Sequence, residues 1–119
     1  MKRYVICNLT KELYHRYPKA PDAVWYLRNL HRHLLHIEVT VEVMHNERDI
    51  EFIMLKHEVE RYYDSLNLDS YKTPHEEISC EQIAELIISM LKRHYGNDRD
   101  IAVSVMEDGE NGARLIDYK

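Results

Sequence analysis

Two histidines, His31 and His33, are the residues of this chain best placed to do chemistry, because of the sequence that follows them. Apolar and polar residues alternate from Ile37 to Val43, a pattern typical of a half-buried β-strand. Extended backwards, the apolar positions include both histidines, so their imidazoles should face the interior about 6.6 Å apart, at roughly 3.3 Å per residue. Buried imidazoles repel one another when charged and need partners when neutral. A zinc ion bound by one nitrogen of each imidazole would satisfy these demands.

The chain also contains enough histidine for such a pair to arise by chance. Eight of its 119 residues are histidines, and a His-x-His pair alone is weak evidence for a metal. We expect four of the others, His36, His45, His57 and His94, to face solvent. The metal interpretation of His31 and His33 therefore depends on the strand that positions them.

Length and composition predict one domain, residues 1–119, with an ordinary apolar content of 45% and a net charge of −5. The negative charge and the lack of a basic run argue against a nucleic-acid partner. No run approaches the roughly 20 apolar residues of a membrane span, and no export signal is visible. Cys7 and Cys80 form no disulfide framework, so we expect a cytoplasmic protein with reduced thiols.

The order of predicted elements is β-β-α-α-β-β. Ser79 and Gln82 form a capping box at the start of the second helix, and Gly96 should end it. A loop that contains Thr73-Pro74 separates the two helices. The predicted strands are 3–9, 31–44, 101–106 and 113–118, and the predicted helices are 50–65 and 79–95. This order predicts an α+β fold, an antiparallel sheet with two helices on one face.

Three segments in this order resemble the 6-pyruvoyltetrahydropterin synthase family, which includes the 6-carboxytetrahydropterin synthases of queuosine biosynthesis. His31-Arg32-His33 resembles its His-Gly-His, residues 78–84 (ISCEQIA) resemble its Pro-Thr-Ser-Glu-Asn-Ile-Ala, and Val105-Met106-Glu107 resembles its Val-x-Glu. The resemblance spans nearly the whole chain. It implies the tunnelling fold (T-fold), a zinc cofactor, a pterin- or purine-like ligand and assembly of identical chains into a barrel, as a trimer or hexamer.

The resemblance also implies a third zinc ligand. The family has a histidine upstream, followed by Arg and then Pro, and His15-Arg16-Tyr17-Pro18 fits this pattern. Zinc on His15, His31 and His33 would keep a fourth position open, as catalytic zinc sites do. Read without the resemblance, His15 could equally lie in a surface turn.

The ligand-binding residues of the family correspond to Glu107, Ser79 and Cys80. A carboxylate can accept both parallel N–H donors on the edge of a pterin or guanine ring, which is the role the resemblance gives to Glu107. Glu107 could instead be an ordinary turn carboxylate. Cys80 could be an inert residue at a helix start, although such a position can lower a thiol pKa.

The chain departs from the family at its acid–base residues. The catalytic cysteine of the family corresponds to Leu27, which cannot exchange a proton. Its catalytic Asp-His pair corresponds to Asp64 and Ser65, and His75 in the next loop is a candidate substitute for the missing histidine. Two hypotheses follow. The first is a zinc-dependent lyase acting on a substrate like dihydroneopterin triphosphate; the second is a non-catalytic or repurposed T-fold protein that binds a pterin- or purine-like ligand.

Overall fold

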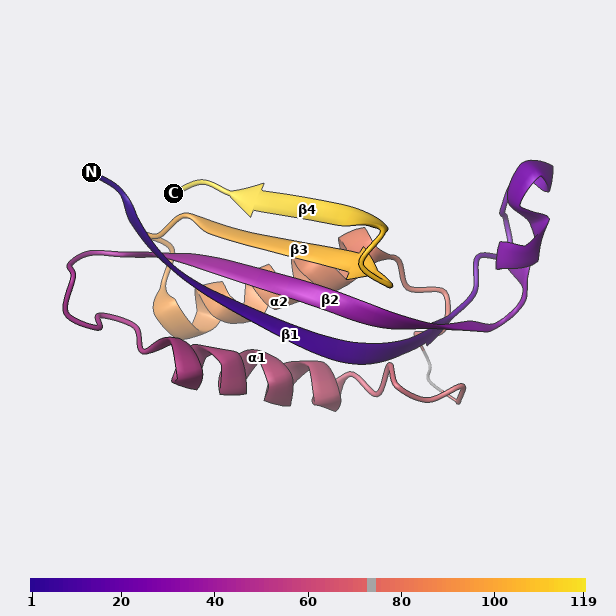
Figure 1. Cartoon of the computed structure of the whole chain (residues 1–119), viewed down its shortest axis with the longest axis horizontal. Helices are drawn as coiled ribbons and strands as arrows, with labels where there is room; N and C mark the ends of the chain where they lie inside the picture. Colours follow the sequence, from indigo (N-terminus) through magenta and orange to yellow (C-terminus); the bar gives the residue numbers. More distant parts are fainter. Residues whose placement is uncertain (73–74) are drawn as a thin grey trace.

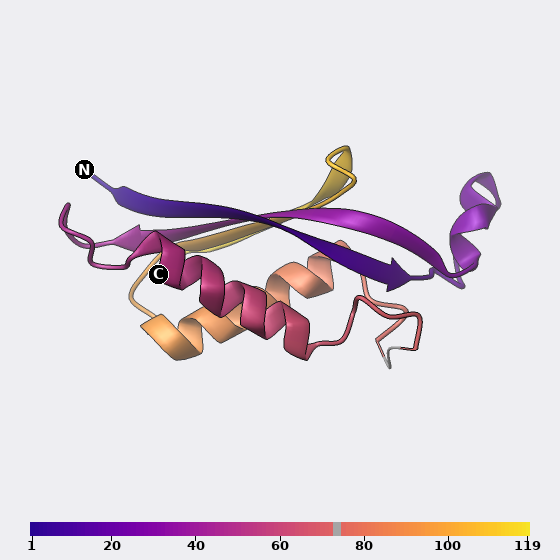
Figure 2. The ribbon, with the colours of Figure 1, turned by 60° about the horizontal axis from the view of Figure 1, so that its bottom comes forward.

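A computed structural model describes residues 1–72 and 75–119 of the chain; Thr73 and Pro74, predicted to lie in a loop, are outside the described residues. Four strands form one antiparallel sheet in the order β1-β2-β3-β4. Figure 1 shows these strands side by side, and Figure 2 shows both helices against one face of the sheet. The predicted α+β class and element order are confirmed. No helix among the described residues is long and apolar enough to cross a membrane.

The sheet is built from two strand pairs joined by the two helices. A short 3₁₀ helix, η1, lies in the β1–β2 connection and projects beyond one end of the sheet (Figure 1). The elements are β1 (Arg3–His15), η1 (Asp22–Arg28), β2 (His31–Val43), α1 (Phe52–Ser65), α2 (Cys80–Tyr95), β3 (Ile101–Glu107) and β4 (Asn111–Asp117).

The α2 helix begins and ends as its sequence predicts. The Ser79 hydroxyl accepts a hydrogen bond from the Gln82 backbone N–H, and the Gln82 side chain accepts one from the Ser79 backbone N–H. Gly96 ends the helix with φ +90, a conformation that glycine adopts without a steric penalty. The apolar stripe of α2 packs on β3 and β4, so the core lies between the helices and the sheet.

The first strand is longer than predicted. It continues past Leu9 to His15 and pairs with β2 along its whole length, from Arg3 opposite Val43 to His15 opposite His31. Its second half contains four charged or polar side chains in seven residues, which obscured the strand in the sequence. Burial still alternates, because Leu9 and Leu13 are buried, Lys11 between them is partly buried, and Thr10 and Glu12 are exposed, so the two-residue period of a strand persists. The final strand likewise begins at Asn111, two residues before the predicted start.

One end of the sheet is closed by a cluster of charged side chains near both termini. Glu42 at the end of β2 and Asp100 before β3 are each 4% exposed. Lys2 approaches Asp100 at 2.6 Å, and Lys119 approaches Glu42 at 3.1 Å. These ion pairs bind the two ends of the chain to the sheet.

Candidate metal centre

The opposite end of the sheet brings the three predicted ligands together. Strand pairing places His15 opposite His31 and Leu13 opposite His33. Because paired residues share a face and alternate residues along a strand share a face, all three imidazoles point to the helix side of the sheet. Glu107 lies opposite Leu35 on β2 and therefore points to the same side.

The three imidazoles form a compact triangle. Their ring centroids are 4.6 Å apart for His15 and His31, 5.1 Å for His15 and His33, and 4.8 Å for His31 and His33. One nitrogen from each ring lies within 4.8 Å of the others. All three residues are partly buried. The alternative that His15 lies in a surface turn is therefore wrong, since His15 is the last residue of β1.

Every ring is oriented through its Nδ1 atom. Nδ1 of His15 lies 2.8 Å from the Ile78 carbonyl oxygen, Nδ1 of His31 lies 2.7 Å from the Asn29 carbonyl oxygen, and Nδ1 of His33 lies 2.7 Å from a carboxylate oxygen of Asp108. Carbonyl and carboxylate oxygens only accept hydrogen bonds, so each Nδ1 carries the proton and donates. A neutral imidazole of this tautomer has its lone pair on Nε2.

Glu107 lies against this triangle. Its Oε2 atom is 3.0 Å from Nε2 of His15 and 3.4 Å from Nε2 of His33. The hydrogen bond from His15 lowers the pKa of the Glu107 carboxyl, with the other imidazoles adding to the effect. Burial lowers the pKa of His15, but its hydrogen bonds to Glu107 and Ile78 outweigh this and raise it overall. Burial and the two neighbouring imidazoles lower the pKa of His31.

The donor set fits zinc. Three imidazole nitrogens around one point are the protein ligands of many catalytic zinc sites, and each ring is held by an outer hydrogen bond, as metal-binding histidines usually are. Nε2 of His33 is also buried without a hydrogen-bond partner among the described residues. Buried polar atoms normally have a partner, and a metal ion would provide one here.

A pocket of about 500 Å³ opens beside the triangle. Leu27, the residue that the resemblance aligns with the catalytic cysteine, lines this pocket. The remaining lining residues come from the end of β1, the start of β2, the start of α2 and the β3–β4 hairpin: His15, Arg16, Tyr17, His31, Glu77, Ile78, Ser79, Cys80, Glu81, Glu107, Asn111 and Gly112. The predicted ligand-binding residues thus share one cavity with two of the three predicted metal ligands.

The structure limits what Ser79 and Cys80 can do in this pocket. The Ser79 hydroxyl already accepts the N-cap hydrogen bond of α2. Cys80 is buried, and burial together with the adjacent Glu107 raises the pKa of its thiol to about 12. The suggestion that the helix start lowers this pKa is therefore wrong, and the inert interpretation is favoured. Cys7 is also a free, buried thiol.

The predicted acid–base residues do not line this pocket. Asp64, at the end of α1, forms an ion pair with Lys11 at 2.8 Å and is largely exposed. His75 lines a separate cavity between the loop and α2. Their catalytic roles stay predictions. The sequence interpretation missed Asp108, because a carboxylate in a hairpin turn gave no signal that it would reach back to β2.

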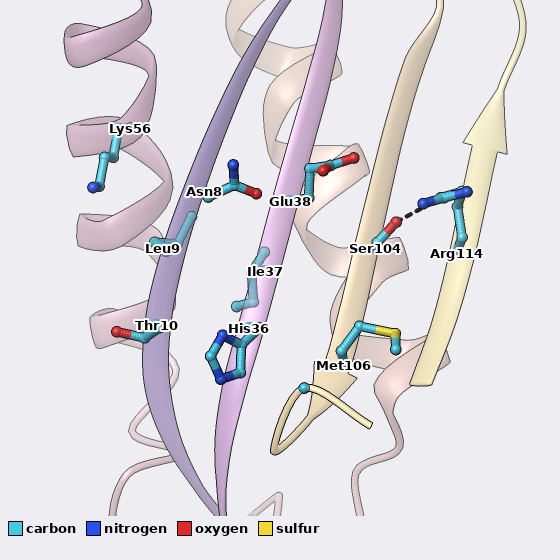
Figure 3. A pocket seen from close by; sticks show the side chains of 11 residues that line it. Asn8, Leu9, Thr10, His36, Ile37, Glu38, Lys56, Ser104, Met106 and Arg114 are labelled. Atoms are coloured by element: carbon cyan, nitrogen blue, oxygen red, sulfur yellow. Dashed lines mark hydrogen bonds between the residues drawn. The ribbon is translucent and has the colours of Figure 1, made fainter. Parts of the chain in front are cut away.

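A second hollow, of about 550 Å³, lies on the sheet near the middle of the strands (Figure 3). Its polar floor follows the register of the strands: Asn8, Glu38, Ser104 and Arg114 face one another across the sheet, and Arg114 donates a hydrogen bond to Ser104. His36 lies here, exposed and on the opposite face from His31 and His33. This hollow has no cluster of metal-binding side chains within the described residues.

Comparison with known proteins now gives the class of fold. A solved structure titled as 6-pyruvoyl tetrahydropterin synthase of Plasmodium falciparum superposes with a TM-score of 0.70 and covers 99% of this chain and 99% of its own. The sequence identity is 16%. No family model and no curated protein matches this sequence. The chain therefore has the T-fold, as the resemblance implied.

Proposed function

We propose that this chain is a divergent protein of the 6-pyruvoyltetrahydropterin synthase family that holds zinc on His15, His31 and His33 and binds a pterin- or purine-like ring in the adjacent pocket. The observation that carries the proposal is the convergence of three imidazoles whose Nδ1 atoms are all occupied as donors. Nε2 of His15 donates to Glu107 at 3.0 Å. Once it gave up that proton, the triangle would offer three Nε2 lone pairs to one zinc ion.

The first form of this function is a lyase acting on a substrate like dihydroneopterin triphosphate. Bound zinc would act as a Lewis acid toward a hydroxyl or carbonyl of the substrate side chain. Glu107 would accept the ring N–H donors, and the low pKa of its carboxyl keeps it an acceptor near neutral pH. Leu27 gives the ring an apolar neighbour but exchanges no proton, so proton transfer would depend on other groups.

The second form, a repurposed binding protein, is favoured by the composition of the pocket. Leu27 stands where the family has its cysteine, and the pocket walls contain the carboxylates of Glu77, Glu81 and Glu107. The lining residue with a positive charge, Arg16, already pairs with Glu76 at 2.5 Å. The side chains that line the pocket would repel a triphosphate group, whereas an uncharged ring carries no charge for them to repel.

One incubation separates the two forms. The purified protein is loaded with zinc and mixed with dihydroneopterin triphosphate, and release of triphosphate is followed by phosphorus NMR while ring binding is followed by fluorescence. Release of triphosphate supports the lyase. Binding of the pterin ring without release of triphosphate supports the binding protein, and a protein that takes up neither zinc nor the pterin contradicts both.

Glu107 offers the sharpest test of ring binding. We expect Glu107→Gln to weaken pterin binding by about tenfold to a hundredfold, since a hydrogen bond to a charged group is worth roughly 1.5–3 kcal/mol. Glu110→Gln is the matched control, because Glu110 is an exposed carboxylate in the same hairpin and does not line the pocket. Equal pterin affinity in both variants would show that Glu107 is not the ring anchor.

We further propose that identical chains assemble into a closed barrel, as a trimer or hexamer in the cytoplasm. β1 and β4 are the outer strands of the sheet and each has one edge without a partner strand among the described residues. Unpaired edges favour addition of another strand, and pairing of β1 with β4 of the next copy would repeat around a ring. Sedimentation of the purified protein measures the number of chains.

A further inference from the structure

We infer that Asp108 is a positioning residue for the metal centre, which holds His33 in the tautomer and orientation that metal binding requires. This inference rests on the proposed zinc role of His33. Asp108 is neither one of the three proposed ligands nor part of the motifs that predicted them.

The Asp108 carboxylate makes two hydrogen bonds to adjacent residues of β2. Its Oδ2 atom lies 2.7 Å from Nδ1 of His33, and its Oδ1 atom accepts a hydrogen bond from the Leu34 backbone N–H at 2.9 Å. The Asp108 backbone N–H in turn donates to the Leu34 carbonyl at 2.7 Å. Three contacts therefore hold the turn after β3 against the start of β2.

Both groups that face this carboxylate are donors, so the site needs two acceptors on one short side chain. An ionised carboxylate has them, whereas the amide of asparagine has one acceptor and one donor. With asparagine, either Leu34 N–H or His33 Nδ1 would face an NH₂ group. If the amide faces His33, the imidazole proton moves to Nε2, which can then no longer bind a metal.

Asp108 differs from the groups that orient the other two rings. His15 and His31 donate to backbone carbonyls, which no substitution removes. His33 alone of the three depends on a side chain. A carboxylate behind a metal-binding imidazole also makes the ring more basic, and loss of such an outer partner typically weakens metal binding about 10- to 100-fold.

The backbone at Asp108 supports this assignment. Asp108 has φ +56, in the left-handed region that residues other than glycine rarely adopt, although Asn and Asp tolerate it better than most. A glycine would fit this conformation more easily. The two hydrogen bonds of the Asp108 carboxylate therefore offset the conformational cost of the positive φ.

The test compares Asp108→Asn with the wild-type chain. Asparagine keeps the size of the side chain and tolerates the positive φ, so the hairpin should form. Zinc affinity is measured by competition with a coloured chelator, and the tautomer of His33 in the metal-free protein is measured by nitrogen-15 NMR. Asp98→Asn is the control that removes an equal charge, because Asp98 is exposed and lies outside the proposed site.

We expect Asp108→Asn to weaken zinc binding about 10- to 100-fold and to shift the His33 proton from Nδ1 toward Nε2. The Asp98→Asn control should match the wild-type chain in both measurements. Unchanged zinc affinity with an unchanged tautomer overturns the inference. Lower thermal stability with normal zinc affinity also overturns it, because a purely structural residue would behave so. A wild-type chain that binds no zinc contradicts the proposed function instead, and the NMR measurement then still tests the orienting role.

Discussion

The two ends of β2 carry two clusters of polar side chains that differ in one respect. At one end, both oxygens of Glu42 and both oxygens of Asp100 have partners among the two terminal lysines, Tyr4 and the backbone. At the other end, the three imidazoles have hydrogen-bond partners for their Nδ1 atoms. Nε2 of His33 has a Glu107 oxygen at 3.4 Å but no hydrogen-bond partner among the described residues. We call the Glu42–Asp100 cluster closed, because its carboxylate oxygens all have partners, and such a cluster stabilises the fold. We call the histidine cluster open, because a nitrogen without a hydrogen-bond partner can still bind a ligand.

The largest effect should come from removing a ligand at the open end. We expect His31→Ala to reduce bound zinc from about one per chain to a trace, a loss larger than the roughly 10- to 100-fold typical of an outer partner. His36→Ala is the matched control, because His36 lies on the same strand and faces the other side of the sheet. Elemental analysis of the purified variants measures the metal. If His31→Ala and His36→Ala contain equal amounts of zinc, the histidine cluster does not bind the metal and does not differ from the closed cluster in this respect.

A smaller effect is expected from the closed end, and on stability alone. The hydrogen bond from Lys2 lowers the pKa of Asp100, and a backbone hydrogen bond from Asp100 lowers the pKa of Glu42. Carboxyls with a lowered pKa contribute stability that is present above their unfolded values of about 3.9 and 4.3 and lost as the pH falls through the folded values. Asp100→Asn should therefore lower the melting temperature by several degrees at pH 7 and flatten its fall below about pH 4.

Asp98→Asn is the control for this measurement, because Asp98 is exposed. Circular dichroism melts from pH 3 to pH 7 would record both variants. The closed cluster is a stabilising one only if Asp100→Asn loses more stability than Asp98→Asn at neutral pH while its zinc content stays normal. A drop in zinc content would mean that the two ends of β2 are coupled.

The sequence predicted more of the metal triangle than of its surroundings, for a physical reason. The strand period placed His31 and His33 on one face, because alternation is a local property of consecutive residues. The pairing of His15 with His31 is a long-range register, and only the family resemblance suggested it. Asp108 was missed because its contact with His33 spans 75 residues and depends on the left-handed turn after β3.

The difference between local and long-range contacts also explains which predictions for α2 were right. The Ser79–Gln82 capping box and the Gly96 stop involve neighbours in sequence and were predicted at the right residues. The pKa of Cys80 depends instead on what packs around it. Its position at a helix start favoured a low pKa, but burial and the nearby Glu107 raise it, and neither can be derived from the order of residues near Cys80.

The smallest expected effect concerns Ser79, which borders the pocket and also caps α2. Its hydroxyl accepts the Gln82 N–H hydrogen bond, and removing an N-cap of this kind costs about 1 kcal/mol. Ser79→Ala should therefore lower the free energy of unfolding by about 1 kcal/mol and leave zinc content unchanged. Ser89→Ala is the control in the same helix, because Ser89 is exposed and does not cap the helix, and alanine favours the helix. Urea titration of both variants gives the difference. If Ser79→Ala loses pterin affinity without losing stability, the hydroxyl contacts the ligand and the cap is a minor part of its role.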